Sequence, residues 1–547
     1  MRTEEYNYRS HWLALVLTVL VLAVYGNNLH APFILDDVPW ILNNENIRRL
    51  WPVWKPLANT SRPVVQWSLA VNYALGGLNL AGYHLTNNLV HAATALALLG
   101  VVRRTLRTPR LSGTFGIAAD GLGFATALLW ALHPLDTESV TYVIQRSESM
   151  AGLFSMLTLY CVIRSATGAR TIAWNCLAVL SCVLAMGSKP VAAVIPFAVL
   201  AYDRVFLSGT WSELWRIRGR LYIGLAVTWV LLAVFLSAGR REWIGSAGVV
   251  SGNRAVGWRD YARLQPGVVL HYLRLSLWPD RLCLLFGRPQ QPSGLLFMAQ
   301  CGAIGVLLVV TFGWLCRRNT AGFLGAWFFL TLAPTSSVIP LLHLVFEHRM
   351  YLPLMAVIAA IVVGAYRILA KLPVAGGANR WLGFGAVIVV GLGLAATTVQ
   401  RNADYRTEVS IWQDTVRKAP ANPDAQYGLG LALATAGRLD EAGPAFSETV
   451  RLRPDFAQVH YNWGLALLKA GRDDEALAHF TEALHIDPRY AEAQDGIGVV
   501  LYHQGRLAEA IEHFFEATHL DPNDAQAHQN LARAVREQQQ QRLSGSK

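Results

Sequence analysis

Three short stretches of the sequence carry acidic and basic side chains in arrangements that could do chemistry. In the first, "FILDDVPW", Asp36 and Asp37 follow the first long apolar run of the chain. A carboxylate at the edge of a membrane is partly desolvated, which raises its pKa and suits a general base that takes a proton from a hydroxyl. The alternative is a solvated loop after a helix end. We predict that Asp36 is the base and that Asp37 holds the loop, because neighbouring side chains in an extended segment point apart.

The second stretch, "HPLDTESVTYVIQRSE", carries Asp136 and Glu138 two positions apart, with Arg146 further along. This spacing brings two carboxylates close to one turn, where they could orient a substrate or bind a divalent cation such as Mg²⁺ or Mn²⁺. The same residues would equally well begin a helix, with Asp136 or Thr137 as the N-cap and Glu138 in the first turn. The sequence leaves open whether a metal ion is required. If one is bound, we expect Asp136 and Glu138 to be its ligands.

The third stretch, "FEHRMYLP", lies at the mouth of an apolar segment. A guanidinium group there suits the phosphate of a lipid-linked substrate, because it can donate two parallel hydrogen bonds. Together with the second stretch, it completes the predicted substrate-binding set: Asp136, Glu138, Arg146, Glu347, His348 and Arg349.

The elements that position these residues are predicted to be membrane-spanning helices. Of the 547 residues, 53% are hydrophobic and only 15% are charged, whereas a soluble protein has about 25% charged residues. Several apolar runs exceed 17 residues, which is enough to cross a bilayer. We expect an all-α, polytopic membrane domain with about eleven spans, near 11–29, 83–102, 116–133, 149–165, 171–187, 190–206, 220–238, 294–316, 321–339, 350–370 and 381–400.

Arginine distribution predicts the orientation of these spans. The loops near 103–110, 204–220 and 317–318 are basic and poor in acid, which marks the cytoplasmic side. The N-terminus is then cytoplasmic, and the C-terminus lies outside. Segment 267–286 is interrupted by Arg274 and Pro279, so we expect a helix in the outer interface. The first two acidic stretches fall in or beside the predicted outer loops 30–82 and 134–148, and a further outer loop is predicted at 239–293. The third stretch lies on the same outer face, between the predicted spans 321–339 and 350–370.

After about residue 400 the sequence becomes charged, rich in alanine and periodic. Gly437, Gly471 and Gly505 are 34 residues apart, and prolines at 420, 454, 488 and 522 keep the same spacing. This period is typical of the tetratricopeptide repeat, in which glycine ends the first helix and proline follows the second. The predicted domains are a membrane domain over 1–403 and a repeat domain over 404–540, with repeats at about 421–454, 455–488 and 489–522 and a capping helix at 523–540.

Several longer stretches carry a family resemblance. "SRPVVQWSLAVNYALGGLNLAGYHLTNNLVHAATALAL", "LLWALHPLDTESVTYVIQRSE" and the "LDD" before "NNENI", in a membrane domain that ends in tetratricopeptide repeats, resemble the transmembrane and tetratricopeptide-repeat-containing (TMTC-like) family of GT-C membrane glycosyltransferases. The resemblance implies transfer of a sugar, commonly mannose, from a polyprenyl phosphate to a Ser or Thr hydroxyl of a protein on the non-cytoplasmic side.

The resemblance also implies roles for individual residues. It assigns the catalytic carboxylate to Asp36 and Asp37 and a role in metal or acceptor binding to Asp136 and Glu138. The arginine-rich composition resembles a bacterial member, which implies the inner (plasma) membrane with the repeats in the periplasm. The expected partners are the lipid-linked sugar donor, a protein acceptor that docks on the repeats, and membrane lipid. No nucleic acid is expected, because the net charge of +11 is explained by arginine in the cytoplasmic loops.

Two other functions remain open from the sequence. One is a GT-C transferase that acts on a lipid or cell-wall glycan, with the repeats as a docking arm. The other is a non-catalytic membrane scaffold that displays a protein-binding repeat domain. A transporter is disfavoured, because most ionisable residues fall at the ends of the predicted spans.

Overall fold

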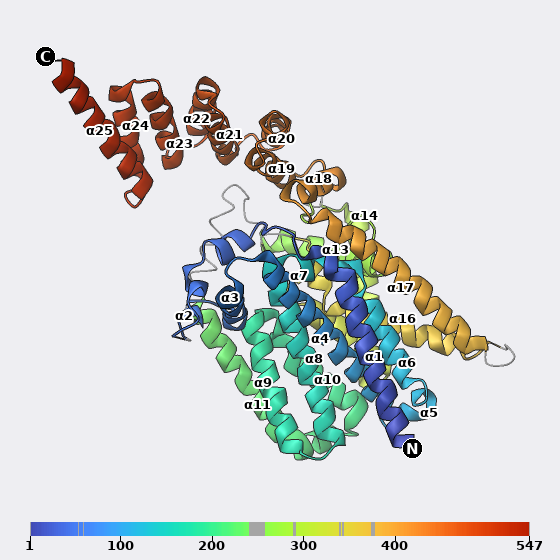
Figure 1. Ribbon diagram of the computed structural model, residues 1–547. Coiled ribbons are helices and arrows are strands. Elements are labelled where there is room, and N and C mark those ends of the chain that lie inside the picture. The colour runs from blue at the N-terminus through green and yellow to red at the C-terminus, as the bar shows by residue number, and fades with distance from the viewer. Residues whose placement is uncertain are drawn as a thin grey trace. The chain divides into compact units, whose positions relative to one another are not determined.

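The computed structural model describes residues 2–52, 54–57, 59–239, 257–287, 291–337, 341, 344–372 and 378–545. These residues form helices and connecting turns, with no β-strand among them, so the predicted all-α class is confirmed. The chain divides into two compact units (Figure 1). Unit 1 comprises Met1–Leu284 and Pro289–Thr407, and unit 2 comprises Leu285–Arg288 and Glu408–Lys547.

Unit 1 contains the membrane helices. Eight helical segments in the described residues are long and apolar enough to cross a membrane, which makes this a multi-pass membrane protein. One of them, Pro190–Leu207, is built from α10 (Ile195–Tyr202) and the short turns on either side. The other seven coincide with or overlap α1 (Arg2–Tyr25), α4 (Leu80–Leu106), α8 (Arg146–Thr167), α9 (Thr171–Ser188), α11 (Trp211–Ala238), α14 (Gly294–Cys316) and α17 (Ala378–Asp404).

Three shorter helices lie in the remaining predicted spans. They are α6 (Ala119–Ala131), α15 (Thr320–Leu332) and α16 (Pro353–Leu369). A helix of 13 residues rises only about 20 Å, which is less than the bilayer core. The total of eleven spans therefore stays a prediction.

The segment predicted to lie in the outer interface has different bounds from those expected. Helix α13 begins at Trp258 and ends at Leu277, and residues 278–287 that follow it are not helical. Its buried side chains, among them Tyr261, Val268 and Tyr272, follow one face. This amphipathic pattern is typical of a helix that is half covered. The predicted loop 239–293 lies partly outside the described residues, at 240–256 and 288–290.

The outer segments of unit 1 hold further short helices. Residues 29–82 contain α2 (Trp54–Leu57) and α3 (Pro63–Gly76), together with short turns at Val38–Leu42 and Glu45–Arg48. Between α6 and α8 lies the single turn of α7 (Thr137–Thr141). At the other end of the unit, α5 (Ser112–Phe115) connects α4 to α6, so that α5 and α7 lie at opposite ends of the helices (Figure 1).

A polar stripe along α4 ties these outer segments to the membrane helices. His84, Asn87, Asn88 and His91 are all buried in one helix that packs against α1, α6 and α8. Buried polar groups must find partners where water is absent. The Asn87 side chain donates to the carbonyl of Val140 at 3.0 Å, and His91 bonds through its two ring nitrogens to the Tyr351 hydroxyl and the Ala131 carbonyl. The stripe therefore fixes the position of the loop that carries the second acidic motif.

Unit 2 is a series of paired helices. Glycines 437, 471 and 505 adopt φ of 75°, 73° and 76°, so the predicted left-handed helix ends are confirmed. Its helices are α18 (Glu408–Lys418), α19 (Pro423–Thr435), α20 (Leu439–Leu452), α21 (Ala457–Lys469), α22 (Asp473–Ile486), α23 (Ala491–His503), α24 (Leu507–Leu520) and α25 (Ala525–Gly545).

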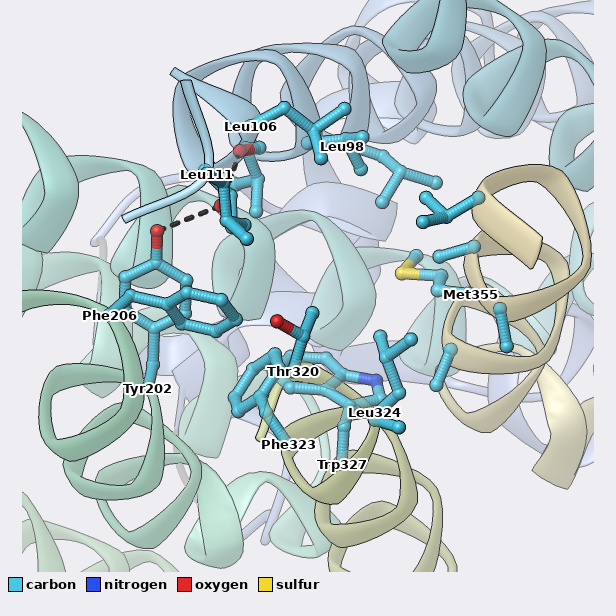
Figure 2. A pocket seen from close by; sticks show the side chains of 18 of the residues that line it. Leu98, Leu106, Leu111, Tyr202, Phe206, Thr320, Phe323, Leu324, Trp327 and Met355 are labelled. Carbon is cyan, nitrogen blue, oxygen red and sulfur yellow. Dashed lines mark hydrogen bonds between the residues drawn. The ribbon is translucent and has the colours of Figure 1, made fainter. Parts of the chain in front are cut away.

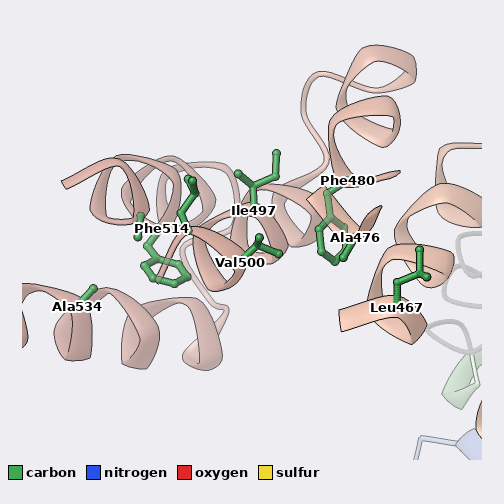
Figure 3. Close-up of a cluster of buried hydrophobic side chains, with 9 residues drawn as sticks. Leu467, Ala476, Phe480, Ile497, Val500, Phe514 and Ala534 are labelled. Carbon is green, nitrogen blue, oxygen red and sulfur yellow. The ribbon is translucent and has the colours of Figure 1, made fainter. Parts of the chain in front are cut away.

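The helix pairs of unit 2 pack through glycine against phenylalanine. Figure 3 shows part of this core, with Phe480 and Phe514 directed into it. A Cβ atom on Gly464 would lie 2.7 Å from the Phe480 ring, and one on Gly498 would lie 2.6 Å from the Phe514 ring. Real Cβ atoms do not approach so closely. Glycine is thus required at these positions for the two helices of a repeat to meet.

Candidate active site

The first acidic motif contains one buried and one exposed carboxylate. Asp37 is fully buried, and its Oδ1 accepts a 2.7 Å hydrogen bond from the backbone N–H of Ile144 while its Oδ2 accepts a 3.1 Å bond from that of Ile34. Burial raises the pKa of Asp37 to about 8, against the opposing effect of the backbone donors. Asp36 is exposed. The predicted division of the pair, with one side chain holding the loop through a backbone amide, agrees with this geometry.

Tyr142 joins the first motif to the second. Its hydroxyl oxygen accepts a 2.8 Å hydrogen bond from the backbone N–H of Asp36. Burial raises the pKa of Tyr142 well above its ordinary value, and the charges of Asp36, Asp37 and Glu138 add to this effect. Three of the predicted acidic side chains therefore lie within electrostatic range of one tyrosine hydroxyl.

The second motif is joined to the third by a pair of side chains. Glu138 Oε1 lies 2.7 Å from His348 Nδ1, and Glu138 Oε2 accepts a 2.9 Å hydrogen bond from the backbone N–H of His348. Both side chains are buried. Loss of hydration raises the pKa of Glu138 and lowers that of His348. The short contact joins a carboxyl to an imidazole and fixes the two loops together.

Asp136 is the acid with unused hydrogen-bonding capacity. Within the described residues, neither of its carboxylate oxygens has a hydrogen-bond partner, although the side chain is completely buried. Burial raises the pKa of Asp136 well above its ordinary value. Asp136 occupies the N-cap position of α7 and Glu138 lies in its first turn, as the helix-start alternative predicts, but the Asp136 side chain makes no capping hydrogen bond. Its oxygens are accordingly available to a substrate donor or a cation.

The donor set offers limited support for the predicted cation. No group of three His, Cys, Asp or Glu side chains that could hold a metal ion occurs in the part of the chain that the structure describes. Both oxygens of Glu138 contact His348, which leaves Asp136 as the available carboxylate of the pair. Mg²⁺ is often held by one or two carboxylates together with substrate phosphates. An ion on Asp136 with a phosphorylated substrate fits this chemistry and stays a prediction.

The third motif is buried and involves a basic residue that the sequence did not single out. Glu347 is completely buried, and its Oε2 lies 3.8 Å from Arg401 Nη2. Arg401 also pairs with Asp404 at 3.2 Å. Arg349 donates from Nη1 to the carbonyl oxygens of Leu344, at 2.7 Å, and Thr335, at 3.3 Å. The third motif thus contributes one acid and one guanidinium group to the same buried region.

Arg146 is enclosed by neutral acceptors. Its Nε donates to Asn87 at 2.5 Å, its Nη1 donates to Asn72 at 2.5 Å, and its Nη2 donates to the carbonyl of Tyr83 at 2.8 Å. The side chain is completely buried. It begins α8 and reaches α3 and α4, so its donors hold three elements together.

One charged pair near this site, Lys189 with Glu148, was outside the predicted set. Lys189 Nζ lies 2.7 Å from Glu148 Oε2, and both side chains are nearly buried. The charges of Lys189, Glu148, Arg349 and Arg62 all act on the His348 ring. Lys189 follows α9 and Arg401 lies in the last turn of α17, where an isolated basic residue resembles an ordinary helix end. Both residues could have been found from the sequence, because each is a basic residue next to an apolar run on the predicted outer face.

Known proteins resemble this chain in both units. A family model for the tetratricopeptide repeat matches residues 396–457 and 461–525. Protein O-mannosyl-transferase TMTC2 of Mus musculus is 33% identical over 179 residues, which cover 29% of this chain. Protein O-mannosyl-transferase Tmtc3 of Drosophila melanogaster is 25% identical over 512 residues, which cover 78% of this chain. The resemblance to the TMTC family is thereby confirmed.

This chain matches only part of the length of these relatives. The chain spans 20% of the length of the mouse protein and 54% of the length of the fly protein. The O-mannosyl-transferase activity in the names of these relatives is therefore a hypothesis for this TMTC-like chain. Among solved structures, MamA from Desulfovibrio magneticus RS-1 has 25% identity over 25% of this chain and 78% of its own, with a TM-score of 0.23.

Proposed function

We propose that this chain is a GT-C membrane glycosyltransferase that moves a mannosyl or similar hexosyl group from a polyprenyl phosphate to a Ser or Thr hydroxyl of a protein. The observation that best supports this proposal is the convergence of three polar motifs from distant parts of the chain. Tyr142 lies near Asp36, Asp37 and Glu138, and Glu138 bonds to His348. The names of the TMTC relatives support the sugar and the protein acceptor.

Asp36 is the proposed catalytic base. A base must contact the substrate, and Asp36 is exposed whereas both oxygens of buried Asp37 accept backbone donors. Asp36 takes the proton of the acceptor hydroxyl while that oxygen forms a bond to C1 of the sugar. The bond between C1 and the phosphate oxygen breaks, and its electron pair leaves with the prenyl phosphate. Attack from the opposite side inverts the configuration at C1.

Basic side chains would stabilise the departing phosphate. Arg349, Lys189 and Arg62 all act on the His348 ring, so the three cations lie in one region of the site. Positive groups aimed at developing negative charge lower the barrier without reorganisation during the reaction. If a divalent cation takes part, Asp136 would hold it, and the cation would neutralise phosphate charge.

The remaining predicted residues divide into substrate contacts and positioning residues. Asp136 and Glu347 are the proposed acidic substrate contacts. Glu138, His348 and Arg146 are proposed as positioning residues, because their hydrogen bonds run to other parts of the protein. They keep the loops in place around the reacting groups.

The acceptor is proposed to dock on the repeats of unit 2. Repeat units have no chemistry of their own and commonly bind extended peptides or protein partners. Polar side chains recur on the first helices of the repeats: the Asn462 amide donates to the Tyr427 hydroxyl, and Asn530 donates to both oxygens of Asp495 at 2.9 and 3.0 Å. Such groups could bind the backbone of an extended acceptor.

We propose that the acidic loops and the repeats face the non-cytoplasmic side of the inner (plasma) membrane. The basic loops support this orientation. Arg103, Arg107 and Arg110 follow or end α4, and Arg317 and Arg318 connect α14 to α15. A donor lipid would then be used at the periplasmic surface.

Substitution of the two aspartates tests the mechanism. Asp36→Asn keeps the size of the side chain but cannot accept the proton, so the transfer rate in proteoliposomes should fall at least about 100-fold, with little change in donor binding. Asp37→Asn should lower the rate less and reduce expression or thermal stability more. Glu45→Gln, at an exposed acid in the same loop, serves as the control and should keep the rate. A near-full rate in Asp36→Asn would remove Asp36 as the base.

A further inference from the structure

The end of unit 1 opposite α7 contains a hydrophobic cavity of about 250 Å³. Its lining comes from α4, α8, α10, α15 and α16. Figure 2 shows aromatic and aliphatic side chains directed into it, among them Phe323, Trp327 and Met355. The Tyr202 hydroxyl lies at its edge and bonds to Thr105 at 2.8 Å. Such a lining matches a hydrocarbon chain and offers few partners to a polar ligand.

A second, polar pocket of about 580 Å³ adjoins this cavity. Phe206 lines both, and the polar pocket continues along the chain from the end of α4 to Arg110. Arg110, Arg218 and Arg318 line it together with Glu213. The two pockets are therefore neighbours on either side of Phe206, one apolar and one lined by basic side chains.

The guanidinium groups of the polar pocket are held by backbone carbonyls. Arg110 Nη1 donates to Val205 O at 2.9 Å, and Arg318 Nε donates to Arg204 O at 3.0 Å. No carboxylate of the described residues lies within 4.0 Å of the charged nitrogens of Arg110, Arg204 or Arg318. Arg218 differs, because it pairs with Asp203 at 2.9 Å.

These cations also repel one another. Desolvation, and then the charges of Arg204 and Arg110, lower the pKa of Arg318, while Glu213 acts in the opposite direction. Arg318 adopts a left-handed backbone conformation with φ of 60°, which is uncommon for a residue with a side chain. A bound anion would relieve the repulsion and supply the missing negative charge.

We propose that this two-part site binds an anionic phospholipid of the adjacent membrane leaflet. The phosphate contacts Arg110 and Arg318, and an acyl chain enters the apolar cavity past Phe206. A basic pocket between membrane helices is the arrangement that recognises acidic lipid head groups. The site lies at the opposite end of unit 1 from the acidic motifs, so it does not depend on the proposed transfer reaction.

Loss of charge from the head-group part is the first test. The full chain, purified in detergent, is titrated with phosphatidylglycerol, and bound lipid is counted by native mass spectrometry, with phosphatidylcholine as the reference. Arg110→Gln and Arg318→Gln should each weaken phosphatidylglycerol binding about tenfold, the usual effect of losing a charged hydrogen bond. Arg317→Gln removes the same charge at an exposed neighbour and should change binding little. Equal weakening by Arg317→Gln, or equal binding of phosphatidylcholine by the wild-type chain, would overturn the proposal.

Filling the cavity is the second test, and it does not touch the arginines. Gly364 lines the cavity, and a Cβ atom on it would meet nothing within 4 Å. Gly364→Leu should therefore place added side-chain volume in the cavity and lower phosphatidylglycerol binding about tenfold. Gly302→Leu, at an exposed glycine of α14 whose added Cβ is equally free, is the control. Unchanged binding in Gly364→Leu, or displacement of phosphatidylglycerol by equimolar polyprenyl phosphate, would refute the phospholipid assignment.

Discussion

The Asp37 carboxylate accepts a 2.7 Å hydrogen bond from the backbone N–H of Ile144, which lies 107 positions further along the chain. This bond joins the loop after α1 to the loop before α8. Because Asp36 is the neighbour of Asp37, the same bond sets where the exposed carboxylate lies. Buried Asp37 therefore contributes to the proposed reaction by positioning Asp36.

The raised pKa of Asp37 predicts that the stability of the folded chain depends on pH. This pKa rises from an ordinary 3.8 to about 8 in the folded chain, so between these values the folded state holds a proton that the unfolded state has lost. The contribution of this group to stability is fully present below pH 3.8 and is lost as the pH rises through 8. Between pH 5 and pH 8 the loss should be at least about 1 kcal/mol. Thermal unfolding of the wild type across this range measures it.

Asp37→Asn provides the comparison, because an amide does not titrate. The stability difference between wild type and variant should shrink as the pH rises, since only the wild type loses the contribution. Parallel curves for the two proteins over pH 5–8 would show that the Asp37 carboxyl titrates in the same range folded and unfolded.

The buried pair of Glu347 and Arg401 makes a second prediction. Arg401→Gln removes from the buried Glu347 carboxylate the cation whose Nη2 lies 3.8 Å from Oε2. Breaking a buried pair from one side costs about 3–5 kcal/mol. Arg417→Gln, in a pair where the arginine is 73% exposed, should cost less than about 1 kcal/mol.

A double variant distinguishes the ion pair between Arg401 and Glu347 from other roles of Arg401. Arg401→Gln with Glu347→Gln should be more stable than Arg401→Gln alone, because no charge is left buried. Urea or thermal unfolding of the wild type, the two single variants and the double variant gives the coupling energy. Additive losses in the double variant would mean that the two side chains act independently.

The repeats make a third prediction at their glycines. Gly464→Ala places a Cβ 2.7 Å from the Phe480 ring, and such overpacking costs about 1–3 kcal/mol. Gly443→Ala meets only the Trp463 ring at 3.7 Å, and alanine favours a helix by up to about 1 kcal/mol. Hydrogen exchange on the full chain should therefore be faster in α21 and α22 for the first variant and unchanged or slower for the second. The same exchange in both variants would contradict the packing argument.

The sequence predicted the repeats well and the site only in part, for one physical reason. Gly437, Gly471 and Gly505 lie at a fixed period because each repeat packs only on its neighbours, so local spacing is enough. The site depends on contacts between distant segments, such as Glu138 with His348 across 210 positions. A contact between such distant segments leaves no repeating pattern in the sequence.

Individual residues also show which parts of the site can be predicted from the sequence. The acids at 36, 37, 136, 138 and 347 were visible because charge is rare beside apolar runs. Arg401 was missed because a basic residue at the end of a helix usually contacts solvent or backbone, and only the fold brings it to Glu347. The bounds of α13 were misjudged because its polar first half, from Trp258, carries little hydropathy signal and its apolar sequence continues past Leu277 without helix.

The last prediction concerns the proposed docking of the acceptor on unit 2. Asn462 and Asn530 occupy equivalent positions two repeats apart, on α21 and α25, and both are amides that could bind an extended backbone. Replacing both by alanine removes two such contacts, each worth about 1 kcal/mol. Transfer to a protein acceptor should therefore fall about tenfold or more, while donor binding stays unchanged because the acidic motifs belong to unit 1.

The control for this prediction lies on the second helix of a repeat. Glu448→Ala removes an exposed pair with Arg451 on α20 and should leave transfer unaltered. Rates are compared with one full-length acceptor protein and with free donor hydrolysis in the same vesicles. If the Asn462→Ala/Asn530→Ala protein transfers as fast as the wild type while its repeats remain folded, these amides do not contact the acceptor. If donor hydrolysis falls equally, the substitutions act on the membrane unit, and the separation of docking from chemistry is wrong.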